Sequence, residues 1–252
     1  PEYRKITQET FIELWSKGMV YADDRPTNWC PACQTTIADA ELEYVPEETD
    51  LCYIKFGLVD GGEIVIATTR PELLCTCATV VYHPTDERYR NLEGKHVTVP
   101  LYNHKVSIKP SNYAKPDFGT GLAMICSFGD STDIKLFREM NLKAKIAITK
   151  EGLINEVSGP YQGLKVHEAR EKIIKAIDAA GLLFKKEKIL HSTPVCWRSK
   201  TPVEFISMDE YYIKQLIFLD ELRKTVDLME FHPPESKQIL LNWINSITVD
   251  WP

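Results

Sequence analysis

The spacing of apolar and polar positions changes several times along the chain. Near the N-terminus, apolar residues recur at helical spacing over 8–17, with Phe11, Ile12 and Trp15 on one face. Gly18 follows at the position where a helix C-cap favours glycine. This pattern predicts a short amphipathic helix. From residue 51 onward, short runs rich in β-branched residues predict strands instead.

Two such runs, 51–58 and 63–69, flank Val59-Asp60-Gly61-Gly62, which is typical of a hairpin turn. Further strands are expected over 78–82, 96–100, 105–109 and 122–127, and helices over 166–180, around 211–226 and over 235–244. Many short strands punctuated by Pro and Gly favour an α/β chain of the α+β type. We therefore expect a mixed sheet or β-barrel-like core with peripheral helices.

Composition and charge exclude several classes. The 252 residues carry 30 Lys+Arg against 36 Asp+Glu, a net charge of -6, with 44% hydrophobic residues. This is an ordinary globular composition, and it argues against disorder and against a surface that wraps nucleic acid nonspecifically. Local basic strips remain, and each is either a solvated face or a nucleic-acid contact: Lys143, Lys145 and Lys150, and Lys185, Lys186, Lys188, Arg198 and Lys200. No apolar run approaches the ~18 residues of a membrane span, so a cytoplasmic protein without membrane contact is expected.

Seven scattered cysteines indicate reduced thiols rather than a disulfide framework. Cys30-Pro31-Ala32-Cys33 has the spacing of half a tetrahedral zinc site, and Cys196 is the obvious partner. Ser199 stands where a second such pair would place its other cysteine, and a neutral hydroxyl is a poor zinc ligand. Cys52, Cys75 and Cys77 are other conceivable ligands. A structural zinc and an unmetallated knuckle of buried thiols fit this pattern equally well.

Two further motifs bring polar groups to strand ends. In Thr68-Thr69-Arg70-Pro71-Glu72, adjacent hydroxyls and a guanidinium follow a predicted strand, which suits either a ligand or a simple turn. In the second, Phe118-Gly119-Thr120-Gly121 precedes the strand that leads to Asp130 and Asp133. Asp130 is either a plain helix N-cap or one of two carboxylates that bind an ammonium group and orient a polar substituent or water.

The common cofactor and nucleophile signatures are missing. The sequence has no Gly-x-Gly-x-x-Gly, no Walker loop and no Gly-x-Ser-x-Gly, and its six histidines show no close pairing. Redox chemistry, phosphoryl transfer and a histidine-based triad are therefore not expected.

Taken in order, the motifs above resemble the editing insertion of class I aminoacyl-tRNA synthetases along nearly the whole chain. Together with 83–89 and 201–206, they are most similar to the archaeal type of the valyl enzymes. The resemblance implies an editing core inserted into a Rossmann-type synthetase, whose own signature motifs are absent from the chain. It implies the divisions 1–50 for a stalk helix and cysteine knuckle, 51–190 for the editing core, and 191–252 for the return to the catalytic body.

The resemblance also implies roles for individual residues. Asp133 matches the aspartate that holds the α-ammonium group of the misattached amino acid, and Asp130 would read the threonine hydroxyl or place water. Thr68, Thr69 and Arg70 would lie near the terminal adenosine. The remaining residues expected to line the substrate are Glu72, Leu73, Phe118, Gly119, Thr120, Met124 and Cys126. Leu73, Met124 and Cys126 depart from the bacterial valyl pattern, which usually has Thr, Lys and Thr there.

The function implied is hydrolysis of the aminoacyl ester of mischarged tRNA, most simply threonyl-tRNA for valine, by a positioned water. No cofactor is required for this reaction, and the zinc of the knuckle would be structural. The implied partners are the aminoacylated acceptor end of tRNA and the rest of the parent synthetase, with the chain itself a monomer. Two alternatives stay open: the same domain of an isoleucyl or leucyl enzyme, and a tRNA-binding module that does not hydrolyse.

Overall fold

The computed structural model describes residues 2–247 and 250–251 of the chain. It forms two compact units, Pro26–Ser207 and Pro1–Arg25 with Met208–Pro252. The helices are α1 (Glu2–Ser16), α2 (Ser131–Glu139), α3 (Val166–Ala179), α4 (Leu219–Leu228) and α5 (Ser236–Ser246). The strands are β1 (Val20–Cys30), β2 (Thr35–Thr36), β3 (Leu42–Leu58), β4 (Glu63–Thr68), β5 (Thr79–Tyr82), β6 (His96–Thr98), β7 (Lys105–Pro110), β8 (Leu122–Ile125), β9 (Leu183–Cys196) and β10 (Glu204–Ile213).

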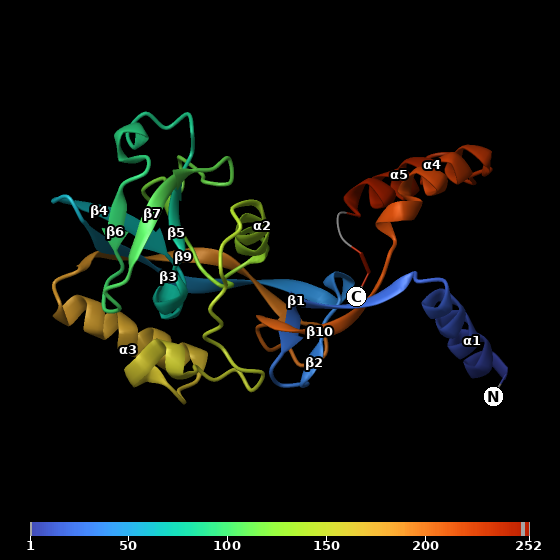
Figure 1. The fold of residues 1–252 in the computed structure, drawn as a ribbon, viewed down its shortest axis with the longest axis horizontal. Coiled ribbons are helices and arrows are strands. Elements are labelled where there is room, and N and C mark those ends of the chain that lie inside the picture. Colours follow the sequence, from blue (N-terminus) through green and yellow to red (C-terminus); the bar gives the residue numbers. More distant parts are fainter. Residues whose placement is uncertain (1, 248–249, 252) are drawn as a thin grey trace. The chain divides into compact units, whose positions relative to one another are not determined.

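The larger sheet lies in the unit Pro26–Ser207 and runs in the order β4-β3-β6-β7-β5-β8, with β9 also paired to β3. Its pairings are antiparallel except for the parallel pair β5 and β7. Its two outer strands approach each other, because Thr120 Oγ1, just before β8, donates to the Val65 carbonyl oxygen of β4 at 2.7 Å. The sheet is thus a curled, barrel-like surface beside α2 and α3 (Figure 1), which confirms the α/β fold predicted from the sequence.

Alternation along β3 and β4 builds the core of this sheet. Cys52, Ile54 and Phe56 are completely buried, whereas Tyr53 and Lys55 between them are partly exposed. The predicted hairpin is confirmed, since the Leu58 N–H donates to the Gly62 carbonyl oxygen at 2.9 Å. One face of α3 buries Ala169, Ile173 and Ile177, as its helical spacing predicts.

A second apolar cluster positions the short helix α2. Leu136 and Phe137 of α2 pack with Val81 of β5 and Ile125 at the end of β8. The rings of Phe128 and Phe137 meet edge to face, with centroids 5.0 Å apart. This packing fixes the first turn of α2 against the end of β8.

Several expectations about elements need correction. The first helix begins at Glu2 rather than near residue 8, and Tyr211 and Tyr212 belong to strand β10 instead of starting a helix. Strands β1 and β9 and the first half of β3 were not predicted from the sequence. Most residues of β9 are exposed or half-buried, so the ribbon of β3 and β9 carries little alternation that could reveal it.

The domain divisions expected at residues 50 and 190 fall inside this ribbon, where Asp50 pairs with Lys188 and Glu48 pairs with Leu190. The two compact units divide the chain near residues 25 and 207, and the divisions at 50 and 190 stay a prediction. Among the described residues, every helix is too short or too polar to cross a bilayer.

Candidate functional site

Asp130 and Asp133 occupy the start of α2. Asp130 is the N-cap, and its Oδ1 accepts the Asp133 backbone N–H at 2.9 Å. This capping bond satisfies one of the free N–H groups at the helix start. Asp130 is exposed, whereas Asp133 is buried with 7% of its surface exposed. The capping interpretation of Asp130 is confirmed, and its exposed carboxylate still leaves oxygen surface for a ligand.

Backbone groups at the end of β8 hold the Asp133 carboxylate. The Gly129 N–H donates to Oδ2 at 2.7 Å, and the Cys126 N–H donates to Oδ1 at 3.3 Å. Burial raises the pKa of Asp133 to about 7, and the nearby charge of Asp130 acts in the same direction, while these backbone hydrogen bonds oppose the rise. Near neutral pH this carboxyl group therefore lies close to the point where it gains or loses its proton.

Gly129 brings three of the sequence-predicted residues together. A Cβ atom at this position would lie 2.8 Å from Asp133 Oδ2 and 3.3 Å from Leu73 Cδ1, and 4.0 Å from Arg70 Cδ. Leu73 is buried with 1% of its surface exposed. The residue after Phe128 must therefore be very small for Leu73, Arg70 and Asp133 to converge here.

Arg70 is held by protein groups. Its Nε donates to Glu72 Oε1 at 2.9 Å, its Nη2 to Glu204 Oε2 at 2.7 Å, and its Nη1 to the Gly129 carbonyl oxygen at 3.2 Å. Because the same Gly129 donates to Asp133, the guanidinium is two hydrogen bonds away from the Asp133 carboxylate. The sequence resemblance implied that Arg70 lies near the adenosine, and in the structure its guanidinium donates to these three protein acceptors.

Glu72 is fully buried and lies between two arginines. Besides Arg70, Arg170 of α3 donates to both of its oxygens, at 2.8 Å each. Burial opposes the charge of Glu72, yet Arg170 and Arg70 hold its pKa below the ordinary value. We call Arg70, Glu72, Arg170 and Glu204 the arginine–glutamate network.

Arg170 and Glu204 were missed as members of this site. Arg170 follows Ala169 and precedes Ile173 by three residues, so it lies at the border of the apolar stripe of α3. A charged residue at the border of a buried helix face is a signal that it pairs with another charged group, and this signal could have identified Arg170.

Thr68 and Thr69 differ in burial and in the hydrogen bonds of their hydroxyl groups. Thr68 is buried, and its Oγ1 accepts the Arg70 backbone N–H at 3.0 Å, which stabilises the turn after β4. Thr69 is half-buried, and in the described part of the chain its hydroxyl has no hydrogen-bond partner. Thr69 is therefore the hydroxyl of this pair that is available to a ligand.

In the segment 118–121 before β8, some residues pack against β4, and another is exposed enough to contact a ligand. Gly119 is pressed against β4, Thr120 bonds to Val65, and the Phe118 ring is 50% exposed. Met124 is half-buried opposite Val80. Burial raises the pKa of the Cys126 thiol well above its usual range, and Cys77 adds to the effect, so Cys126 is a neutral thiol beside Asp133.

The predicted thiol cluster is assembled elsewhere in the unit Pro26–Ser207. The sulfur atoms of Cys30, Cys33 and Cys196 all lie within 4.8 Å of one another, and Ser199 Oγ lies 3.2 Å from Cys30 Sγ. A tetrahedral zinc with bonds of about 2.3 Å needs sulfurs roughly 3.8 Å apart, so these residues fit such an ion. Cys52, Cys75 and Cys77 are not among the three thiols that cluster here in the described chain.

One protein family and several curated relatives match this chain over its whole length. The family model described as "tRNA synthetases class I (I, L, M and V)" matches residues 1–252. The chain is similar to the valine–tRNA ligases of Aeropyrum pernix, at 49% identity over 100% of the chain and 31% of the relative, and of Pyrobaculum aerophilum, at 50% over 100% and 31%. That of Nanoarchaeum equitans is 47% identical over 100% of the chain and 33% of the relative. The chain thus spans about a third of the length of these relatives.

Among solved structures, one similar chain is the AgnB2 LeuRS of Agrobacterium radiobacter K84, in a ternary complex with tRNA and LeuAMS. The TM-score is 0.42 at 18% identity, over 79% of this chain and 35% of that chain.

Proposed function

Because this chain belongs to the class I tRNA synthetases (I, L, M and V), we propose that it hydrolyses the ester of a mischarged tRNA, with threonyl-tRNA for valine as the main substrate. The observation that carries the proposal is the buried, hydrogen-bonded position of the Asp133 carboxylate. This carboxylate is buried at the end of β8 and held by the backbone N–H groups of Gly129 and Cys126, and Asp130 caps the same helix start. The sequence resemblance assigns Thr69 to the same pocket. The similar valine–tRNA ligases of Aeropyrum pernix and Pyrobaculum aerophilum support the choice of tRNA.

In this proposal Asp133 binds the α-ammonium group of the misattached amino acid. Burial raises the pKa of Asp133 to about 7, so the free site holds a mixture of charged and neutral forms at neutral pH. An ammonium group within hydrogen-bond distance favours the carboxylate, since opposite charges at ~4–6 Å lower a carboxyl pKa. Substrate binding and ionisation of Asp133 are therefore coupled.

Hydrolysis itself requires a water held against the ester carbonyl. In the described chain, Cys126 beside Asp133 is a neutral thiol, so attack by a positioned water is the simplest chemistry that these groups support. The exposed Asp130 carboxylate and the unpaired Thr69 hydroxyl are the groups that would orient this water. A free hydroxyl of the terminal ribose would assist, and full-rate cleavage of a substrate lacking that hydroxyl would refute this part.

The need for such a site follows from the similarity of the two amino acids. Threonine differs from valine by exchange of one methyl group for a hydroxyl, and an apolar pocket rejects this change only about 100-fold. A site that hydrogen-bonds the hydroxyl leaves its own polar groups unpaired when valine enters, which costs about 1–3 kcal/mol for each group. Asp130 and Thr69 are the polar groups proposed to make that distinction.

The test compares deacylation of threonyl-tRNA and valyl-tRNA, both on tRNA for valine, by the 252-residue chain. We expect selective loss of threonine, abolished in Asp133→Ala and kept in Asp178→Ala, which removes an exposed carboxylate on α3. Asp130→Ser keeps a good N-cap and removes the charge, so a loss of selectivity in this variant separates substrate recognition from helix capping. Equal cleavage of both substrates, or full activity of Asp133→Ala, would refute the proposal. Cleavage of mischarged isoleucine or leucine tRNA instead would identify one of the other enzymes of the group.

A second candidate function is tRNA binding without hydrolysis. It is favoured by one observation: each oxygen of Asp133 already accepts a backbone N–H, so a structural role accounts for its burial. Tight binding of tRNA with no ester cleavage by the wild-type chain would support this alternative.

A further inference from the structure

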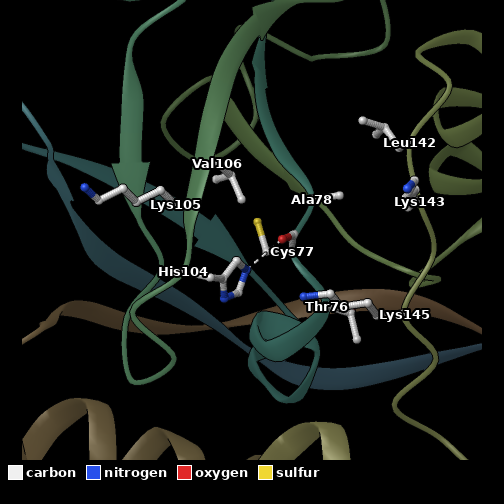
Figure 2. Close-up of a pocket in the computed structure, with 9 residues that line it drawn as sticks. All are labelled: Thr76, Cys77, Ala78, His104, Lys105, Val106, Leu142, Lys143 and Lys145. Carbon is white, nitrogen blue, oxygen red and sulfur yellow. Dashed lines mark hydrogen bonds between the residues drawn. The ribbon is translucent and has the colours of Figure 1, made fainter.

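A pocket of about 220 Å³ opens between the start of β7 and the segment that follows α2. Its wall is formed by 76–78, and its rim carries His104, Lys105, Lys143 and Lys145. Figure 2 shows the Lys145 side chain extending toward Thr76 and His104, whereas Lys105 points away from the centre. No carboxylate is among the residues that line this pocket.

The charges around the pocket are not compensated. Within the described part of the chain, Lys105, Lys143 and Lys145 have no ion-pair partner. The other basic strip noted in the sequence behaves differently. There, Lys186 and Lys188 both pair with Asp50, at 3.3 and 3.0 Å, and Lys200 pairs with Glu43 at 2.6 Å.

The positive charge at this pocket is opposite in sign to the net charge of the chain, which is -6. Like charges that share a hollow repel one another, and an anion placed between them relieves the repulsion. The volume of this pocket is below the roughly 300–1,000 Å³ typical of sites that enclose a whole drug-sized ligand. It therefore suits a small anionic group of a larger molecule that continues outside the pocket.

The pocket shares its wall with the candidate active site. Thr76 Oγ1 accepts the Ser127 backbone N–H at 3.3 Å, and Ser127 Oγ accepts the Lys145 backbone N–H at 3.1 Å. Ser127 directly follows Cys126, whose N–H binds Asp133. On the other side, His104 Nε2 donates to the Cys77 carbonyl oxygen at 2.8 Å, which fixes the ring at the rim. A group bound here and an ester bound at Asp133 would contact the two sides of the same short segment.

We propose that this pocket binds a backbone phosphate of a single-stranded RNA segment, with Lys143 and Lys145 as its main contacts. That this strand is the one whose ester end reaches Asp133 rests on the proposed function. Lysine ammonium groups neutralise phosphates without reading sequence, so the contact contributes affinity and register rather than base specificity.

The test measures binding of a fluorescein-labelled single-stranded RNA of about 12 nucleotides, within the length range that such grooves contact, to the 252-residue chain at several KCl concentrations. We expect K143Q/K145Q to weaken binding at least about 5-fold and to reduce the slope of log K against log salt by about 0.7, the value for one lost phosphate contact on a single strand. K143R/K145R should keep both values near wild type. The matched control K172Q/K175Q removes two exposed lysines of α3 and should change neither value.

Two other measurements distinguish an RNA phosphate from free inorganic phosphate, and distinguish failure of this inference from failure of the proposed hydrolysis. Inorganic phosphate should compete only weakly with the RNA, and its tight binding without RNA binding would overturn the inference in favour of a free phosphate. An unchanged affinity and salt slope in K143Q/K145Q would also overturn it. Hydrolysis of a phosphate-free threonyl ester of adenosine should be equal in wild type and K143Q/K145Q. If the wild type hydrolyses neither this ester nor the tRNA, the proposed function fails while the RNA-binding measurement still decides the role of the pocket.

Discussion

At the scale of single residues, Asp133 combines a buried position with a carboxyl group that the surroundings keep partly protonated. Burial and the charge of Asp130 raise its pKa to about 7 from an ordinary value near 3.8. The folded chain therefore binds this proton more tightly than the unfolded chain does. By linkage, the stability that this group contributes is fully present below about pH 4 and is lost as the pH rises to about 7.

The first prediction follows from this loss of stability with rising pH. Asp133→Asn cannot ionise, so its free energy of unfolding should rise relative to wild type as the pH increases from 4 to 7, by at most about 1.4 kcal/mol for each pH unit. Above pH 7 the difference should stay constant. Urea denaturation of both proteins at several pH values measures it. A difference that is flat from pH 4 to 7 would show that the carboxyl group titrates normally.

The second prediction concerns Glu72 in the arginine–glutamate network. Glu72→Gln keeps the shape and removes the charge that Arg70 and Arg170 share. It leaves the half-buried Arg170 guanidinium without a carboxylate partner and Arg70 with Glu204 alone. We expect a loss of about 3–5 kcal/mol in the free energy of unfolding, measured by urea denaturation.

Glu63→Gln is the matched control for this change, because Glu63 is 55% exposed and pairs with Lys55 at 3.2 Å. It should cost less than about 1 kcal/mol. Similar losses in the two variants would contradict a structural role of the network.

The positions of these residues were easier to predict from the sequence than their contacts. It placed Asp130 and Asp133 together, because a helix start fixes their spacing within a few residues. It assigned Arg70 and Glu72 to the ligand, whereas the structure pairs them with Arg170 and Glu204. Those partners lie 98 and 134 positions away in the chain, and a local motif carries no information about such distant contacts.

At the scale of elements, the predicted strands are those that bury at least part of their side chains, and β5 is buried at every position. The hairpin of β3 and β4 and helix α3 were predicted because each alternates buried and exposed positions with a clear period. The ribbon of β3 and β9 was missed because both of its faces are largely exposed along 42–50. Its pairing comes from backbone hydrogen bonds and from cross-strand contacts such as the Asp50 ion pairs, which leave no periodic signal.

The third prediction tests how the sheet curls. Gly119 has φ +59°, and a Cβ there would lie 2.4 Å from the Ala67 Cβ of β4. Gly163 has φ +81° with nothing within 4 Å of such a Cβ, so it is a control for backbone strain alone. Gly163→Ala should cost about 1 kcal/mol, and Gly119→Ala at least about 2 kcal/mol more because the two strands must separate.

Thermal and urea denaturation of both variants measure this difference. In Gly119→Ala, the further change Ala67→Gly should recover part of the lost stability, since it removes the clashing atom. Equal losses for the two single variants would show that the approach of this loop to β4 is not tight.

At the scale of the whole unit Pro26–Ser207, the thiol cluster joins segments that are far apart in sequence. Cys30 ends β1 and Cys196 ends β9, and the contact between Cys30 and Ser199 connects positions 169 apart. Cys30 and Cys196 are completely buried in a small core with Ile37 and Val203. Closing so long a loop restricts the unfolded chain strongly, so a metal ion bound here would stabilise the fold as a whole.

The last prediction is that the chain binds one zinc ion through Cys30, Cys33 and Cys196, with the Ser199 hydroxyl or a water completing the tetrahedron. Ser199→Cys supplies a fourth thiolate at a position that already lies 3.2 Å from Cys30 Sγ, and it should tighten zinc binding at least about 10-fold, whereas Ser199→Ala should keep three-thiolate affinity. Metal content after dialysis and competition with a coloured chelator measure the affinity. Chelation should lower the melting temperature of the wild type, and Cys33→Ser should remove this dependence. A chain that purifies without zinc, and whose melting temperature neither zinc nor chelator changes, would identify the cluster as a purely apolar knuckle of reduced thiols.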